Sequence, residues 1–204
     1  MGSWRSKYEK IIKDNLALAW SKDPEGLQDR IGATRHVDAY SLRAFGKHCI
    51  IEHNEILLDG QPERGPLGVI ISLYVLNASN EPIVLEPFRS FMELPNTMPY
   101  QGAFRSNAEA PLVAHVEKIS QERDTIVRRF GGHNAPEELK GDLSFVVYPL
   151  PKVALAYIFY LPDEDFPASA TCLFSCNALS FMPLDGLADV AEYTSKAIIE
   201  MVTA

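Results

Sequence analysis

The sequence predicts an α+β fold, in which an antiparallel sheet packs against several helices within a single compact domain spanning residues 1–204. Strand-like patterns occur in two blocks, residues 40–59 and 143–174, and helix-like patterns fill the stretches around them. Such blocks favour an antiparallel sheet, because a doubly wound parallel sheet would need strands and helices in strict alternation. With 204 residues, 47% of them hydrophobic, the chain is long and apolar enough to form its own core.

The first half of the chain begins with an amphipathic pattern that predicts a helix. Its apolar residues recur at steps of three and four: Trp4, Tyr8, Ile11, Ile12, Leu16 and Ala19. We expect this helix to end near Asp23-Pro24. Three short apolar runs follow at residues 42–45, 49–51 and 56–58, and the polar residues between them predict hairpin strands.

Residues 67–78 are apolar on all sides, a pattern shared by buried helices and buried strands. Pro66 suits the first turn of a helix, whereas the β-branched run at residues 69–71 favours a strand. We predict a helix here. Residues 82–94 are expected to be extended.

The second half predicts one further helix followed by three strands. Pro111 suits the start of a helix over residues 111–130, and Gly131-Gly132 suits its end. The predicted strands are residues 143–148, 152–161 and 168–174, and the first two form a hairpin through Pro149-Leu150-Pro151.

The last predicted helix covers residues 184–202. One face is apolar and carries Leu184, Leu187, Ala191, Thr194, Ile198 and Met201. On the other face, Glu192 and Lys196 stand four residues apart, the spacing of a helical ion pair.

Charge and hydropathy argue against several classes of partner. The formal charge is −8, from 19 Lys and Arg against 27 Asp and Glu, and no basic stripe is present, so nucleic acid is not an expected partner. The longest apolar runs are about half the length of a membrane-spanning helix, so no membrane association is expected. Three cysteines are too few for a disulfide framework, and with no secretory pattern near Trp4 they predict a cytoplasmic protein.

Two segments place carboxylates beside aromatic residues and prolines: Phe91-Met92-Glu93-Leu94-Pro95 and Asp163-Glu164-Asp165-Phe166-Pro167. Carboxylates in apolar surroundings need a partner, a metal or a ligand. We therefore predict one concave ligand-binding site lined by Arg89, Phe91, Glu93, Tyr100, Phe104, Asp163, Glu164 and Asp165. The alternatives are two unrelated turns, a buried ion pair between Arg89 and Glu93, and a purely structural role for Tyr100 and Phe104 in the core.

No metal site is predicted. The acidic turn alone supplies fewer ligands than the six to eight oxygens that calcium takes. Cys172 and Cys176 are interpreted as structural cysteines. On a strand their thiols would lie about 13 Å apart, too far to bind one metal ion together. His48 and His53 flank the run that contains Cys49, but they lack the spacing of a metal-binding pair.

Several short motifs, taken in order, resemble a prokaryotic family known as domain of unknown function 3786. They are Leu73-Tyr74-Val75-Leu76, Phe91-Met92-Glu93-Leu94-Pro95, Tyr100-Gln101-Gly102-Ala103-Phe104, Gly131-Gly132, Gly141-Asp142, Pro149-Leu150-Pro151 and Asp163-Glu164-Asp165-Phe166-Pro167-Ala168. The resemblance implies a largely anaerobic distribution. Some members carry an iron–sulfur domain similar to that of corrinoid iron–sulfur proteins, whose four cysteines this chain lacks. At Ser175 the family often has Asp, and no catalytic residue can be carried over from it.

Three functions from different classes are compatible with these features. The first is a ligand-binding or accessory domain, which the resemblance would link to anaerobic cofactor or corrinoid metabolism. Its partner would be a small molecule or a protein of that metabolism, and the cofactor itself is left open. The second is a small hydrolase or transferase that uses Glu93 or the acidic turn at 163–165 as acid or base. The third is a protein-interaction module that docks a basic partner.

Overall fold

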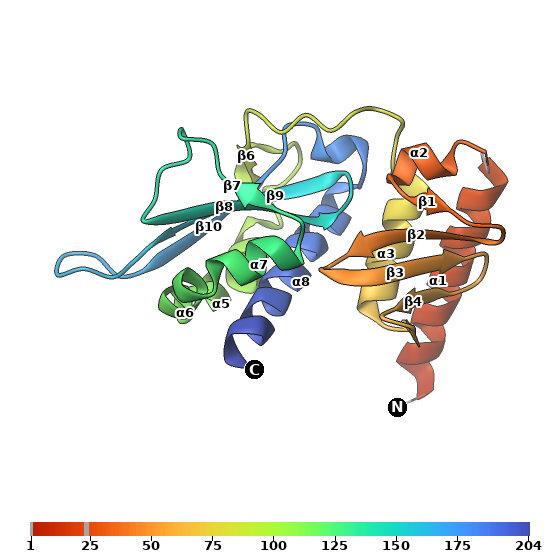
Figure 1. The fold of residues 1–204 in the computed structure, drawn as a ribbon, viewed down its shortest axis with the longest axis horizontal. Helices are drawn as coiled ribbons and strands as arrows, with labels where there is room; N and C mark the ends of the chain where they lie inside the picture. The colour runs from red at the N-terminus through yellow and green to blue at the C-terminus, as the bar shows by residue number, and fades with distance from the viewer. Residues whose placement is uncertain (1, 23–24) are drawn as a thin grey trace.

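The computed structural model describes residues 2–22 and 25–204, and it contains two antiparallel sheets that lie side by side (Figure 1). The first helix, α1, spans Gly2–Lys22, so its predicted end near Asp23-Pro24 falls outside the described residues. The prediction of an α+β fold with antiparallel strands is confirmed, although two sheets take the place of the single sheet expected.

The first sheet has five strands in the order β1-β2-β3-β4-β5. Their bounds are Thr34–Arg35, Ala39–Ala44, Lys47–Glu52, Ile56–Leu58 and Gln61–Pro62. The three predicted runs correspond to β2, β3 and β4, which confirms the hairpins. The short edge strands β1 and β5 lack the apolar alternation that would have predicted them.

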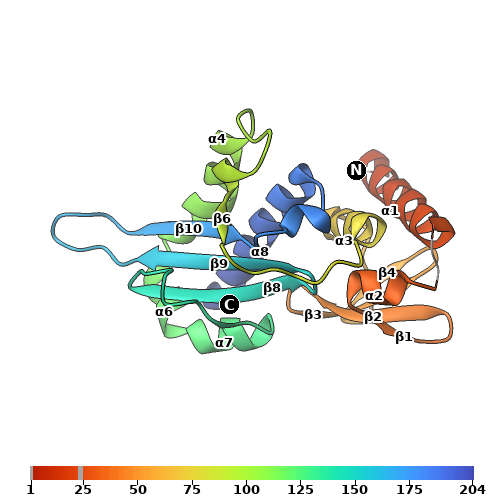
Figure 2. The same ribbon diagram turned by 90° about the horizontal axis from the view of Figure 1, so that it is seen from above.

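Helices α1 and α3 (Pro66–Asn77) lie beside each other against this sheet, and the short α2 (Leu27–Ile31) caps one end (Figure 2). The prediction of a helix at 67–78 is confirmed. Gly68 allows α1 and α3 to approach closely, because a Cβ there would lie 2.7 Å from Cδ1 of Ile12. The β-branched run is tolerated because Ile70 and Ile71 are buried in the core, which outweighs their weak helix propensity.

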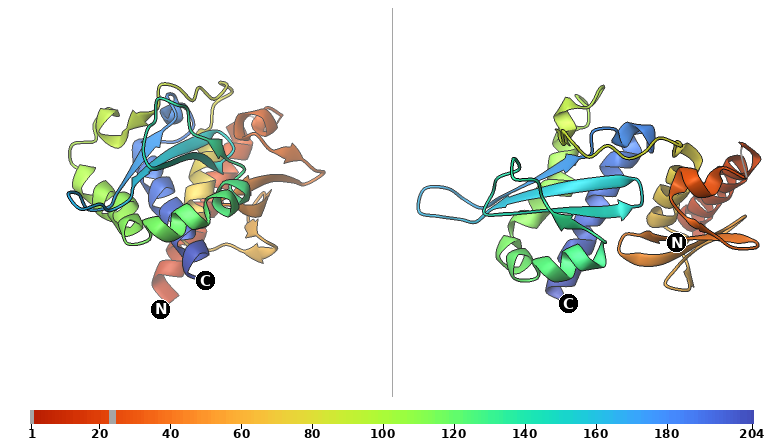
Figure 3. Two further views of the ribbon diagram at one scale, coloured as in Figure 1. Left: turned by 60° about the vertical axis from the view of Figure 1, so that its left-hand side comes forward. Right: turned by 45° about the horizontal axis from the view of Figure 1, so that its top comes forward.

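The second sheet has the order β6-β10-β9-β8-β7. Its strands are Arg89–Ser90, Ser169–Phe174, Val153–Tyr160, Leu143–Leu150 and His133–Asn134. The predicted hairpin at 143–161 and the third strand are confirmed. The β9–β10 loop projects beyond the rest of the molecule (Figures 2 and 3).

The terminal helix α8 (Leu184–Thr203) confirms the predicted helix at 184–202 and buries Leu187, Val190, Ala191 and Ile198. The face of the second sheet that carries Val146, Ala154 and Ala156 packs against residues of the segments 83–88 and 135–139. No helix among the described residues combines the length and the apolar character needed to cross a membrane.

The prediction of one helix over residues 111–130 is wrong, because the structure has three short helices there. These are α5 (Ala110–Val113), α6 (Val116–Gln121) and α7 (Arg123–Arg129). The backbone leaves helical geometry at His115 and Glu122. Since α5 contacts β10 and α8, α6 contacts α8, and α7 contacts β8, the bends let each piece pack against different elements.

The extended stretch predicted at 82–94 ends earlier than expected. Residues 91–93 form a 3₁₀ helix, η1 (Phe91–Glu93), which follows β6 directly. The chain then continues through α4 (Gln101–Phe104) into a π-helix, η2 (Arg105–Glu109), neither of which was predicted.

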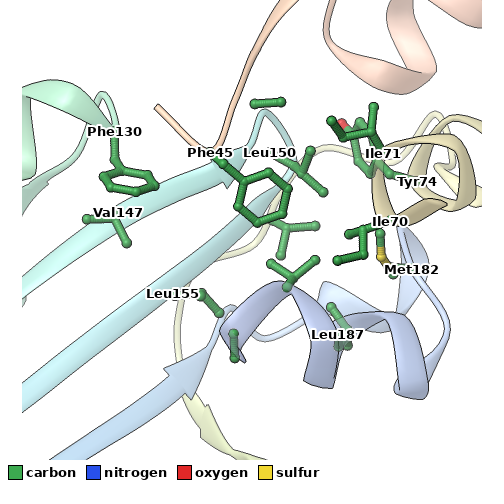
Figure 4. Packing of buried hydrophobic residues seen from close by; sticks show 14 of the residues in the cluster. Phe45, Ile70, Ile71, Tyr74, Phe130, Val147, Leu150, Leu155, Met182 and Leu187 are labelled. Carbon is green, nitrogen blue, oxygen red and sulfur yellow. The ribbon is translucent and has the colours of Figure 1, made fainter. Parts of the chain in front are cut away.

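The hairpin turn between β2 and β3 joins the two sheets. Phe45 and Gly46 both have positive φ, at 49° and 72°. The Phe45 N–H donates to the carbonyl oxygen of Pro149 at the end of β8 (2.7 Å). Its ring points into a cluster of buried side chains contributed by both sheets, α3 and α8 (Figure 4).

Candidate functional site

A cavity of about 170 Å³ lies between the segment from η1 to η2 and the first half of α8. Three of the predicted site residues, Phe91, Tyr100 and Phe104, line it. The other lining residues are Ala103, Asn107, Ala108, Leu184, Asp185, Ala188, Asp189 and Glu192. The structure therefore brings together the aromatic part of the predicted site, with a helix that had not been assigned to it.

The floor of this cavity, called the α8 cavity below, is aromatic. Phe91 and Phe104 stack with their ring centroids 4.2 Å apart and their planes 4° from parallel. Phe174 of β10 packs against both rings. Phe91 and Phe104 are almost fully buried, whereas Tyr100 is 52% exposed at the rim. The interpretation of Phe104 as core is thus correct as well, because the same ring belongs to the core and to the cavity lining.

The opposite wall carries the charge. Asp185, Asp189 and Glu192 stand on one side of α8, because positions four and three residues apart share a helix face. The predicted pair on this helix is confirmed, with Nζ of Lys196 2.6 Å from Oε1 of Glu192. Oδ1 of Asp185 accepts the N–H of Gly186 (3.0 Å). Among the described residues, the Asp189 carboxylate makes no hydrogen bond or ion pair.

The surroundings of Asp189 disfavour its ionised form. Partial burial, followed by the negative charges of Glu192 and Asp185, raises the pKa of its carboxyl group, and Lys196 only partly opposes this. An added cation beside Asp189 would relieve both effects, because it stabilises the ionised form.

A buried polar network behind the cavity fixes its two walls. The Ser195 hydroxyl of α8 donates to the carbonyl oxygen of Ala108 in η2 (2.6 Å), and Ser195 Oγ lies 3.1 Å from the Tyr157 hydroxyl of β9. Oε1 of Glu109 accepts the backbone N–H of Cys172 in β10 (3.0 Å). Desolvation raises the pKa of Glu109. These bonds hold the π-helix against both the sheet and α8, and π-helical turns are frequent at functional sites.

Glu93 does not enter the α8 cavity. Its Oε2 accepts the hydroxyl (2.8 Å) and the backbone N–H (2.7 Å) of Ser90, and these bonds lower the pKa of Glu93. Because Glu93 is exposed, the alternative of a buried ion pair with Arg89 is wrong, and no such pair occurs among the described residues. Glu93 instead caps the 3₁₀ helix η1.

The acidic turn lies far from the other predicted site residues. Ser90 of β6 pairs with Leu173, at the opposite end of β10 from the turn. The four residues from Leu173 back to Ser169 cover about 13 Å, and Asp163 to Asp165 lie beyond that. Oδ1 of Asp163 accepts the N–H groups of Asp165 (2.9 Å) and Phe166 (2.7 Å). The alternative of two unrelated turns therefore describes the structure, and the single shared site does not form.

The described residues contain no group of three or more His, Cys, Asp or Glu side chains placed to hold a metal ion. Burial raises the pKa of the Cys49 thiol to about 12, and it also raises the pKa of Cys172. Both thiols are therefore protonated at neutral pH, the form that binds metals poorly. His48 is exposed while its neighbour Cys49 is buried, because successive residues of a strand point to opposite faces.

A smaller, partly open cavity of about 130 Å³ lies between α1 and the β4–β5 hairpin. Three of its charged side chains, Glu9, Glu55 and Arg64, form ion pairs. Arg64 lies 3.9 Å from Glu9 and 3.3 Å from Glu55. The α8 cavity differs because its described lining residues include three carboxylates and no lysine or arginine.

The model of the family described as domain of unknown function (DUF3786) matches residues 23–197. The chain therefore belongs to this family, as its motifs predicted. No curated protein and no solved structure matches the chain.

Proposed function

We propose that this chain is a ligand-binding or accessory domain whose α8 cavity takes a protonated amine or guanidinium group on a short apolar stem. Such a group occurs in small organic cations and at the ends of lysine and arginine side chains of a partner protein. The observation that carries the proposal is the pairing of an aromatic floor with the carboxylates of Asp185, Asp189 and Glu192.

The size of the cavity supports a ligand of this kind. A cavity of about 150 Å³ can hold one benzene molecule, so about 170 Å³ suits the end of one side chain or a small amine. The apolar stem would lie against Phe104, Leu184 and Ala188, while the charged head faces the carboxylates. Long cationic side chains commonly divide their contacts in this way.

Exposed apolar residues beside the cavity support a partner protein as the source of the cation. The segment that supplies Phe91 and Tyr100 also exposes Met92 (68%) and Met98 (84%). Methionine is common at adaptable binding surfaces. An accessory role is favoured over the acid–base alternative, because the Glu93 carboxylate is bonded to Ser90 and the acidic turn lies outside the cavity lining.

The link to anaerobic cofactor or corrinoid metabolism rests on the family resemblance and stays a prediction. A corrin ring is too large for a cavity of about 170 Å³ to enclose, so a corrinoid would reach this domain through a partner protein. A cytoplasmic location is part of the same proposal, and it is supported by the free cysteines Cys49, Cys172 and Cys176.

Calorimetric titration of the full chain with n-butylammonium and with a short neutral peptide containing one lysine tests the proposal. We expect both to bind and n-butanol, which has the stem without the charge, to bind at least about tenfold more weakly. Tighter binding of the peptide would identify a partner side chain as the source, and tighter binding of the amine a small molecule. Equal binding of n-butanol and n-butylammonium would contradict the proposal.

Exchanging Asp189 for Asn is expected to weaken n-butylammonium binding about tenfold, because it removes a charge-assisted contact. The melting temperature at pH 7 should be unchanged or higher. The raised pKa means that the folded state favours protonated Asp189. Ionisation of Asp189 therefore lowers the stability of the fold as the pH rises through that pKa, and a neutral amide removes this loss.

The raised pKa of Asp189 also predicts how cation binding depends on pH. The unmodified protein should have its full affinity for n-butylammonium above this pKa, where the carboxylate is ionised, and should lose affinity as the pH falls through it.

Glu200→Gln is the matched control for the Asp189→Asn exchange. It removes one negative charge from an exposed position of the same helix, outside the cavity lining. We expect its affinity for n-butylammonium to stay within about twofold of the unmodified protein. An equal loss in both variants would show that only the overall charge matters.

A further inference from the structure

A hollow on the outer face of the first sheet, separate from the α8 cavity, is open to solvent. It has a volume of about 380 Å³ and lies where the β2–β3 hairpin meets the end of α7. Its polar lining consists of Thr34, Ser41, Arg43, His48, Asp59 and Arg129. Cross-strand pairing places Thr34 opposite Ser41 and Arg43 opposite His48, which brings these four side chains to one face.

A hydrogen bond from the side chain of Arg43 to the backbone of Arg129 connects the two arginines. Nη1 of Arg43 donates to the carbonyl oxygen of Arg129 (2.7 Å), so a strand of the first sheet is bonded to the end of α7. The Arg129 side chain crosses the hairpin turn at Gly46, where a Cβ would lie 2.9 Å from its Cγ and 3.4 Å from its Nε. Both guanidinium groups thus border the same hollow, and glycine at the turn leaves room for one of them.

Positive charge exceeds negative charge at this place, on a chain with a formal charge of −8. Asp59 is the one carboxylate of the lining, and its Oδ2 lies 4.0 Å from Nη2 of Arg129 with both side chains about half exposed. Its Oδ1 already accepts the backbone N–H of His48 (3.0 Å). Two guanidinium groups, two hydroxyls and an imidazole therefore face a single, partly engaged carboxylate, a composition suited to a dianion.

A neighbouring hollow of about 390 Å³ shares Arg43 with the hollow lined by Arg129 and Asp59. The rest of its lining is Gly32, Phe130, Gly131, Tyr148 and Pro151, with no other charged residue. The ring of Tyr148 is partly exposed, and its hydroxyl lies 3.1 Å from Nε2 of His133. An apolar or ring-shaped group attached to the anion could contact this surface.

We propose that these two adjoining hollows form a binding site for a small organic phosphate. The phosphate group binds the guanidinium groups of Arg43 and Arg129, and the hydroxyl of Ser41 lies within the same lining. The organic part lies beside Tyr148 and Pro151. Guanidinium is suited to this ligand because its planar array of donors matches phosphate oxygens in pairs.

Calorimetric titration of the full chain with phenyl phosphate tests the proposal, with inorganic phosphate and phenol as the two halves of the ligand. We expect phenyl phosphate to bind more tightly than either half. Equal affinities for phenyl phosphate and inorganic phosphate would overturn the two-part site. Absence of binding by phenyl phosphate at millimolar concentration would overturn the proposal altogether.

Variants of the lining should change the affinity in opposite directions. Arg129→Gln is expected to weaken phenyl phosphate binding about tenfold, through loss of a charge-assisted contact. Asp59→Asn should strengthen it several-fold, because the amide oxygen can still accept the His48 N–H while the repelling charge is gone. Arg128→Gln is the matched control, since Arg128 is exposed on the same helix and does not line the hollow.

A purely structural role for these residues would give a different pattern. Losses of similar size in Arg128→Gln and Arg129→Gln, or a weaker affinity in Asp59→Asn, would contradict the site. Arg43 and Arg129 also connect β2 to α7, so a substitution there could weaken binding by destabilising the fold. Thermal melts of each variant distinguish this effect from a direct loss of binding. A variant that loses affinity while it keeps its melting temperature supports the proposal, and loss of both together counts against it.

Discussion

Replacing Phe45 with alanine is expected to lower the free energy of unfolding by about 3–5 kcal/mol, the usual cost of removing a buried phenylalanine ring. Phe45 is 3% exposed, and its ring enters the cluster between the two sheets (Figure 4). The positive φ of 49° is equally unfavourable for alanine, so the loss measures the ring and the cavity it leaves. Urea unfolding followed by circular dichroism gives this value.

Phe166→Ala provides the control for Phe45→Ala. It is the same substitution in the exposed β9–β10 loop, where the ring is 71% exposed, and it should cost less than about 1 kcal/mol. The shape of the transition is informative as well, because the single domain predicted for residues 1–204 would unfold in one step. Two separate transitions in Phe45→Ala would mean that the sheets fold independently, and a loss equal to that of Phe166→Ala would contradict the packing of Phe45.

Alanine substitutions at Leu187 and at Ile198 are each expected to cost about 2–5 kcal/mol, from lost transfer free energy plus the remaining cavity. Both side chains are fully buried on the face of α8 that packs against the core. The helix contacts α3 at one end and the helices α5 and α6 farther along, so it has little freedom to collapse into either space. Chemical denaturation at equilibrium measures both losses.

Ile11→Ala is the matched control for Ile198→Ala, because Ile11 is a helical isoleucine that remains 42% exposed on α1. Its cost should stay below about 1 kcal/mol. Losses below about 0.5 kcal/mol at both Leu187 and Ile198 would mean that the buried face of α8 has been assigned incorrectly.

The fold could be predicted where the pattern of the sequence is local. Strands β8 and β9 are nearly continuous apolar runs, and helix α8 carries an apolar stripe at helical spacing, so all three follow directly from the sequence. Residues 111–130 also have helical spacing, yet the bends at His115 and Glu122 depend on three different packing partners, which no local pattern reveals. The division into two sheets depends on how the tip of the β2–β3 hairpin packs against β8, and this contact is likewise non-local.

The site could be predicted only in part. Phe91, Tyr100 and Phe104 line one cavity, and because they are close in sequence they could be grouped from the sequence. Glu93 and Asp163 were misassigned, because each carboxylate satisfies nearby backbone N–H groups, a local role that sequence composition does not distinguish from ligand binding.

One signal for the missing wall was present in the sequence. Asp185, Asp189 and Glu192 recur at steps of four and three along the predicted terminal helix, so an acidic stripe could have been identified beside the apolar one. What the sequence could not supply is the position of η2, whose contact with α8 through Ser195 and Ala108 turns that stripe into the wall of a cavity.

The most direct test of the proposed cation site is an NMR titration of the isotopically labelled chain with n-butylammonium. We predict that the backbone amide shifts change mainly in two stretches far apart in sequence, residues 100–108 and 184–192, and that Asp189→Asn reduces these changes while Glu200→Gln leaves them in place. Shift changes confined to other parts of the chain, or equal changes in both variants, would contradict a cation site at the α8 cavity.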